Sequence, residues 1–198
     1  MKRKLLILFL FAVTSVLLAQ KDPCNCNETT PIDRQHRTKA KHVTNYGAYA
    51  RAKYNITPDD VTGWQDLYST FTRNANKDTE RILETPEDSL FVLDGYMYFV
   101  KQEANDCDYH IEIGPKSIKS KRRIIVEVSQ ENCDLQQKIM EYIVSNGFKL
   151  NKQFTKGLPC TVIGLGFYDA AHKPNHHGGN YTHKTSWELH PVKSIEFN

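Results

Sequence analysis

Carboxylates and histidines recur at short spacing in three separate stretches of the chain. These side chains are Asp106, Asp108 and His110 in "DCDYHIEI", Asp169 and His172 in "GFYDAAH", and Glu188 and His190 in "WELHPV". Carboxylate oxygens and imidazole nitrogens bind zinc, manganese or iron, and with fewer nitrogens magnesium or calcium. They also act as general acids and bases. The three stretches therefore predict a divalent-metal or acid/base site, if the fold brings them together.

The roles within this site follow from residue type. We expect the ion to be held by some of five residues: Asp108, His110, Asp169, His172 and His190. Glu188, beside His190, and Glu127, inside the apolar run "IIVEV", are candidate general bases acting on a metal-bound water. The spacings match neither a zinc-protease motif nor a cysteine-rich zinc motif. Ordinary solvent-facing residues, paired across strands, are therefore the alternative interpretation.

The elements that carry these residues are predicted to be five strands and one helix. Branched and aromatic runs mark strands at 90–102, 108–113, 123–128, 161–169 and 186–197. Between the third and fourth strands, Leu135, Ile139 and Ile143 share one face of a helix over 134–146, which Gly147 ends. This order predicts a mainly β fold, a five-stranded OB-like Greek-key barrel. A small α+β fold with a mixed sheet is the alternative.

Strict alternation in the second strand predicts where the polar side chains point. Its odd positions, Cys107, Tyr109, Ile111 and Ile113, are mainly apolar, and its even positions, Asp106, Asp108, His110 and Glu112, are polar. Successive residues of a strand face opposite sides, so we expect the polar set to project from the barrel wall. Strands two and five both flank strand three in an OB barrel. We therefore expect His110 and His190 on the same side of the barrel, with neither filling the core.

The N-terminal region is predicted to contain a secretory signal. Three basic residues precede an apolar run from Leu5 to Ala19, which is too short to span a bilayer comfortably. We expect residues 1–19 to be a signal peptide cleaved after Ala19, and the product to be periplasmic or extracellular. Residues 20–56 then form a polar, basic extension that we expect to be flexible, 57–89 a short helical lead-in, and 90–198 the barrel domain.

Net charge indicates no partner once the signal is removed. The chain has 26 Lys and Arg against 23 Asp and Glu, and three of the basic residues lie in the signal, so the mature protein is formally neutral. This balance implies no polyanionic partner for the protein as a whole. Within the extension, however, Arg34, Arg37, Lys39 and Lys41 are candidate contacts to a polyanion. A solvated leader is the alternative.

Five cysteines accompany the predicted export, which permits disulfides. Cys24 and Cys26 lie in a polar stretch and are interpreted as cysteines of the tail. Among the three cysteines of the barrel we expect one disulfide that includes Cys107. In a hairpin of strands two and three, Cys107 lies opposite the end of strand three, which makes Cys133 the first candidate partner and Cys160 the second.

From about Asp94 to Phe197 the chain resembles a family of uncharacterised exported bacterial proteins. The motifs that carry the resemblance are D-x-D-x-H at 106–110, the E-V that ends strand three, "GLGFYDAAH" at 164–172 and "ELHPV" at 188–192. The resemblance implies that the family pattern includes Asp108, His110, Glu127, Asp169, His172, Glu188 and His190. It implies no reaction, and it does not include residues 20–90.

Two classes of function fit these observations. The first is a metal-assisted hydrolase acting on a phosphodiester or a similar bond. The second is a binding module without chemistry, since an OB face also holds oligosaccharides or nucleic acid by aromatic stacking. Tyr109 and Trp187 are available for stacking, but their alternation favours the core. A metal that only tightens the barrel is a third possibility.

Overall fold

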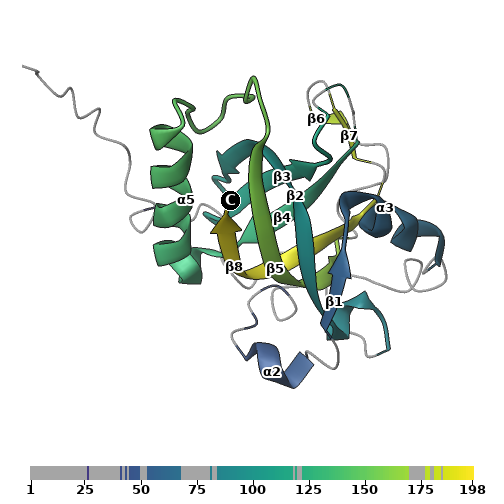
Figure 1. The fold of residues 1–198 in the computed structure, drawn as a ribbon. Helices are drawn as coiled ribbons and strands as arrows, with labels where there is room; N and C mark the ends of the chain where they lie inside the picture. Colours follow the sequence, from purple (N-terminus) through teal and green to yellow (C-terminus); the bar gives the residue numbers. More distant parts are fainter. Residues whose placement is uncertain are drawn as a thin grey trace, which may run out of the picture.

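Five strands close into the predicted barrel (Figure 1). They are β2 (Leu90–Gln102), β3 (Tyr109–Gly114), β4 (Arg122–Val128), β5 (Leu158–Tyr168) and β8 (Trp187–Phe197). β2 pairs antiparallel with both β3 and β5, β3 pairs antiparallel with β4, and β5 pairs antiparallel with β8. A parallel contact between β4 and β8 completes the ring. The prediction of an OB-like barrel is confirmed.

The structure is a computed structural model, and it describes part of the chain. The described residues are 26, 41, 43, 45–49, 53–67, 81, 84–117, 119, 122–169, 177–178, 181–183 and 185–198. The predicted signal peptide, Arg34, Arg37, Lys39 and His172 lie outside them. In the described ranges we find no helix with the length and apolar character needed to cross a bilayer.

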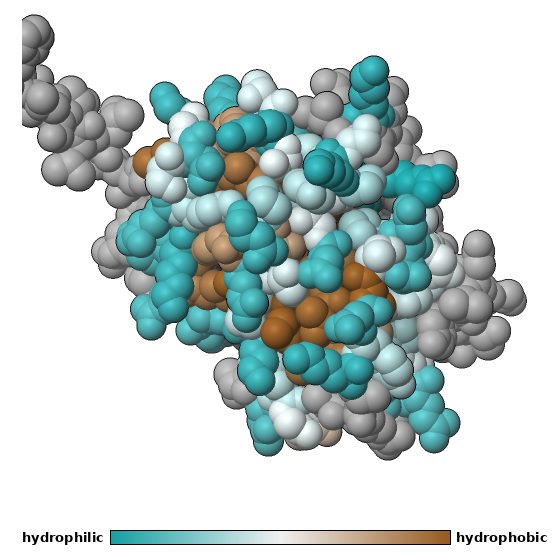
Figure 2. All heavy atoms as spheres, viewed as in Figure 1, coloured by the Kyte–Doolittle hydropathy of each residue, from teal (hydrophilic) through white to brown (hydrophobic). Residues whose placement is uncertain are grey.

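The interior of the barrel is built from the apolar half of each alternating strand. Tyr109, Ile111 and Ile113 on β3 are fully buried, as is Leu189 on β8, and Trp187 is 1% exposed. These residues belong to one hydrophobic cluster, so the predicted core positions are confirmed. Burial of each large apolar side chain stabilises the fold by about 1.5–3 kcal/mol. On the face in Figure 2, hydrophilic side chains predominate, and the largest apolar area lies over β2 and β5.

Helix α5 (Cys133–Ser145) lies between β4 and β5 in the chain, where the sequence predicts it. A short 3-10 helix, η4 (Gln130–Asn132), leads into it. The apolar face of α5 contributes Leu135, Ile139 and Ile143 to the core cluster. At its far end Tyr142 stacks on Phe197, with ring centroids 4.0 Å apart. The helix therefore continues the barrel core at one side of the molecule (Figure 1).

Further elements surround the barrel. They are α2 (Tyr46–Tyr49), β1 (Lys53–Ile56), α3 (Pro58–Leu67), η3 (Pro86–Asp88), β6 (His177–Gly178) and β7 (Tyr181–His183). β1 extends the sheet by pairing parallel with β2. Trp64 of α3 packs on Phe91 and meets Trp187 edge-on, at centroid distances of 4.5 and 5.9 Å. β6 and β7 pair with each other, and β7 pairs with β4.

The disulfide prediction is wrong in its pairing. Cys107 is bridged to Cys26, with 5.8 Å between their Cα atoms. Cys133 is also disulfide-bonded, and Cys160 is buried and free. The prediction failed because it treated Cys26 as part of a tail, whereas this residue lies against the barrel. Its carbonyl oxygen accepts a hydrogen bond from Gln130 Nε2 at 3.2 Å.

Candidate metal centre on the outer face of the barrel

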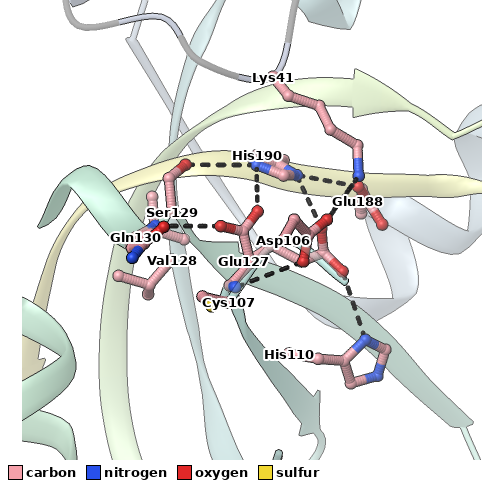
Figure 3. Close-up of polar contacts among 12 residues, drawn as sticks. Lys41, Asp106, Cys107, His110, Glu127, Val128, Ser129, Gln130, Glu188 and His190 are labelled. Atoms are coloured by element: carbon pink, nitrogen blue, oxygen red, sulfur yellow. Dashed lines mark hydrogen bonds and ion pairs between the residues drawn. The ribbon is translucent and has the colours of Figure 1, made fainter. Parts of the chain in front are cut away.

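His190 lies at the centre of a group of buried carboxylates (Figure 3). Its Nδ1 is 2.8 Å from Glu127 Oε2 and 3.4 Å from Glu188 Oε1. Its Nε2 is 3.4 Å from Asp108 Oδ2. The imidazole is completely buried. Acidic groups therefore lie against both ring nitrogens.

Strand register explains why these residues meet. His110 pairs with Glu127 across β3 and β4, and Val126 pairs with Leu189 across β4 and β8. Since Val126 and Leu189 point into the core, the residues that follow them, Glu127 and His190, point outward on neighbouring strands. The predicted outward projection of the polar set is confirmed.

Glu127 joins the two histidines. Its Oε1 lies 3.4 Å from Nδ1 of His110, and its Oε2 faces His190. The expectation that both imidazoles lie on the same side of the barrel is therefore confirmed. His190 points away from the core, as expected, but it is completely buried, because other parts of the chain cover this face.

Three residues offer ligand atoms close enough to share one ion. Each contributes one ligand atom, and these three atoms, from Asp108, Glu127 and His190, lie within 4.8 Å of one another. Asp108 and His190 were predicted as ligands, whereas Glu127 was predicted as a base and instead lies in the ligand group. Carboxylate and imidazole donors of this number are found in metal sites of zinc, manganese and iron proteins.

The other predicted site residues lie around this group. His110 contacts the opposite oxygen of Glu127, and Glu188 lies beside His190. Asp169 is 2% exposed, and its charge acts on both Glu188 and Lys41. It is not one of the three residues grouped as ligands.

Several atoms in this group lack a hydrogen bond despite complete burial. They are Asp108 Oδ2, Glu127 Oε2, Glu188 Oε1 and His190 Nδ1. The short separation of Glu127 from His190 is that of an ion pair, but its geometry is not that of a hydrogen bond. A buried polar atom without a hydrogen bond typically costs about 1–3 kcal/mol. These atoms converge from the outer faces of β4 and β8 and from the start of β3. A bound cation would provide the partner that they lack.

Lys41 closes the site from outside. Its Nζ lies 3.8 Å from both Glu127 Oε2 and Asp106 Oδ2, and the residue is only 8% exposed. Lys41 is therefore buried against carboxylates and is not solvated as a leader residue would be. An ammonium group forms favourable ion pairs with such carboxylates when both are shielded from water.

Arg81 forms a second part of the cover. Its guanidinium donates hydrogen bonds to the carbonyl oxygens of Glu87, at 3.0 Å, and Gly166, at 2.6 Å. It also donates to the carbonyl oxygen of His190. Phe167 lies beside both cationic side chains, with the Lys41 and Arg81 charges each 5.9 Å from its ring centroid. The outer face of β8 is therefore enclosed by polar and aromatic groups.

The mutual charges determine the protonation of the group. Burial lowers the pKa of His190, but contacts with Asp108, Glu127 and Glu188 outweigh it, so this pKa is raised well above 6.5. Burial raises the pKa of Glu127, but Lys41 and the two histidines outweigh it and hold this pKa well below 4.5. Burial and the neighbouring Glu127 raise the pKa of Glu188 to about 7. Glu127 and His190 thus form a carboxylate–imidazolium pair.

Ser129 is a polar neighbour that sequence reasoning missed. Its Oγ lies 3.4 Å from Nε2 of His190, at the junction of β4 and η4. A serine, a histidine and a carboxylate in this order resemble a nucleophilic triad. A general base needs a neutral imidazole, however, and the contacts of His190 with carboxylates raise its pKa and so favour the protonated ring. The direction of this shift disfavours activation of the serine by His190.

Comparisons with known proteins identify no family. No protein-family model matches the chain, and no curated protein is similar to it in sequence. Among solved structures, the fold search found asparaginyl-tRNA synthetase of Entamoeba histolytica, with a TM-score of 0.35 and 12% identity. The match covers 55% of this chain and 20% of the synthetase chain. At this level of similarity the comparison carries no argument about function.

Proposed function

We propose that this protein is a metal-binding OB-like domain, in which Asp108, Glu127 and His190 hold one divalent cation. The observation that carries the proposal is the set of buried atoms without hydrogen bonds, to which each of the three residues contributes one. A divalent cation would satisfy these atoms. It would also offset the negative charge of the surrounding carboxylates.

The donor set indicates the class of ion. Two carboxylates and one imidazole suit zinc, manganese or ferrous iron better than magnesium or calcium, which prefer oxygen ligands alone. Ligand histidines must be neutral, so binding releases the proton that His190 carries in the metal-free protein. Affinity for the ion should therefore increase with pH.

The burial of the three ligands favours a structural ion over a catalytic one. All three ligands are at most 4% exposed, and Lys41 lies across their outer side. An ion there would join the start of β3 to β4 and β8. A non-catalytic binding face for nucleic acid or sugar is less favoured, because the covered face leaves little room and both Tyr109 and Trp187 are core residues.

Metal-assisted hydrolysis is the second candidate function. Glu188 favours it, because this carboxyl group lies 3.4 Å from His190 and outside the ligand group, where a general base would act on a metal-bound water. A phosphodiester substrate would require the cover over the site to move. Bis(p-nitrophenyl) phosphate, with and without added metal, tests this candidate.

Metal analysis tests the main proposal. The purified mature protein, stripped with EDTA and titrated with Zn²⁺ and with Mn²⁺ in a calorimeter, should bind one ion. Asp108→Asn should weaken binding at least tenfold, since it removes a charged ligand. Glu141→Gln, on the exposed face of α5, is the matched control and should bind like the wild type. A wild-type protein that takes up neither ion contradicts the proposal.

We also propose that the protein is exported, with cleavage after Ala19. The Cys26–Cys107 bridge supports this, because disulfides persist in oxidising compartments. N-terminal sequencing of the mature protein tests it. A chain that begins at Met1 would overturn the cleavage.

A further inference from the structure

Lys41 and His190 contact the same carboxylate oxygen. Glu127 Oε2 lies 2.8 Å from Nδ1 of His190 and 3.8 Å from Nζ of Lys41. In Figure 3 the Lys41 side chain extends toward the carboxylates from a segment outside the sheet. The oxygen is fully buried and has no hydrogen bond. This oxygen is therefore contacted both by Lys41, which covers the site, and by His190, which belongs to the site.

A bound ion and the Lys41 ammonium would be close neighbours of like charge. Glu127 supplies one of the ligand atoms proposed for the ion, and both of its oxygens lie on the small carboxylate that Lys41 faces. Like charges at a few ångströms repel strongly where water is excluded. The carboxylates of Glu188, Asp169 and Asp106 also act on Lys41, so neutralising this group with an ion would weaken the hold on the ammonium.

From this geometry we propose that Lys41 is an intramolecular competitor of the metal, so that binding of the ion releases the Lys41 ammonium from Glu127. This inference rests on the proposed metal site and adds its regulation. Occupancy of the site and the position of the Lys41 side chain become coupled, and the coupling is reciprocal.

Two described residues that follow Lys41 in sequence are tied to the barrel. Val43 is 8% exposed, and the Tyr46 hydroxyl donates a hydrogen bond to the carbonyl oxygen of Val192 at 3.1 Å. Both residues line a cavity of about 180 Å³ together with Ser129. Displacement of Lys41 would therefore be confined to its side chain, since Tyr46 is held at Val192.

Charge substitutions at Lys41 test the competition. Lys41→Met keeps an unbranched apolar side chain and removes the charge, so it should bind Zn²⁺ or Mn²⁺ about tenfold or more tightly than the wild type. Lys41→Arg keeps the charge and should not show this gain. Lys152→Met changes the net charge equally at an exposed residue after α5, and should leave the affinity unchanged.

A second measurement uses the unaltered protein, in case Lys41→Met does not fold. The buried Lys41 amine should react slowly with acetic anhydride in EDTA, compared with the exposed Lys152 in the same sample. Saturating metal should raise the acetylation of Lys41 severalfold relative to Lys152. Peptide mass spectrometry reads both sites.

The outcomes separate this inference from the proposed function. If wild type and Lys41→Met bind metal equally, or if metal leaves Lys41 protected, the competition is overturned and the metal site stands. If only Lys41→Met binds metal, the competition is supported and the native protein is not a metal-binding protein. If no variant binds metal, both proposals are overturned.

Discussion

The carboxylate of Glu127 and the imidazole of His190 form a buried ion pair, 2.8 Å apart, across the parallel contact of β4 with β8. The backbone register of this contact is the single pair Val126 and Leu189. The other neighbouring strands of the barrel pair over longer antiparallel registers. The ion pair therefore lies at the junction that has the least backbone pairing, where the barrel closes.

Glu127→Gln should destabilise the protein strongly. The amide leaves the positive charges of His190 and Lys41 without their main partner, and breaking one side of a buried pair typically costs about 3–5 kcal/mol. Denaturation in guanidinium chloride measures the loss. Glu141→Gln is the control, because its exposed site should change the free energy of unfolding by no more than about 0.5 kcal/mol. Equal stability of both variants would show that the pair contributes little to closure.

The metal-free protein should be most stable near pH 4.5 and should lose stability as the pH rises. The lowered pKa of Glu127 stabilises the fold above 4.5 and loses its effect as the pH falls below that value. The raised pKa of His190 stabilises the fold fully below 6.5, and this contribution is lost as the pH rises through its folded-state value. The raised pKa of Glu188, about 7, adds a contribution that is fully present below 4.5 and is lost between 4.5 and 7, because the carboxyl group ionises first in the unfolded chain.

Thermal melts in EDTA over a pH series measure this profile. The melting temperature should fall from pH 6 to pH 8, and Glu188→Gln should reduce that fall because it removes one ionisation. A melting temperature that rises steadily from pH 5 to pH 8 would contradict the assigned protonation states.

Gly166→Ala should disturb the cover of the site. An added Cβ would lie 2.3 Å from the carbonyl oxygen of Pro86, in η3, so this helix must shift. The shift would strain the hydrogen bond from Arg81 to the Gly166 carbonyl. We expect a loss of about 1–3 kcal/mol in the free energy of unfolding.

Gly63→Ala is the matched control for that change. An added Cβ at Gly63 meets nothing within 4 Å, and the residue lies on α3. The same substitution there should stabilise the helix by about 0.5–1 kcal/mol. If both alanine variants are equally stable, η3 is not packed as closely on β5 as the structure shows.

Cys26→Ser should lower stability by about 2–4 kcal/mol, because the lost bridge joins residues separated by 81 positions. A non-reducing peptide map should contain Cys26 linked to Cys107. Cys160→Ala should leave this linkage intact, since Cys160 is free. A peptide that links Cys107 to Cys133 would disprove the pairing in the structure.

The fold was predictable because its signals are local. Alternation around Tyr109 and the helical spacing of Leu135 and Ile139 each need only a short window of sequence, and the order of elements then indicated the barrel. The grouping of Asp108 with His190 followed from that topology. The protonation of the group and its burial did not follow, since both depend on residues far away in the chain.

Lys41 and Arg81 show why these features were missed. Neither lies near the site in sequence: Lys41 contacts the carboxylate of Glu127, and Arg81 donates to the carbonyl oxygen of His190. The same holds for Cys26, which no pattern links to Cys107. The need for glycine at position 166 likewise depends on a distant segment, because Pro86 approaches this residue closely.

The bridge from Cys26 to Cys107 affects the effective concentration of the Lys41 ammonium at the metal site. It holds Cys26 at Cys107, the residue before Asp108, and the hydrogen bond of Tyr46 holds that residue at Val192. A group held in this way has an effective concentration at its target on the order of millimolar, whatever the dilution of the protein. The concentration of an external ion must therefore exceed a threshold that is set by competition with Lys41. Reduction of the bridge would lower the threshold without altering any ligand of the site.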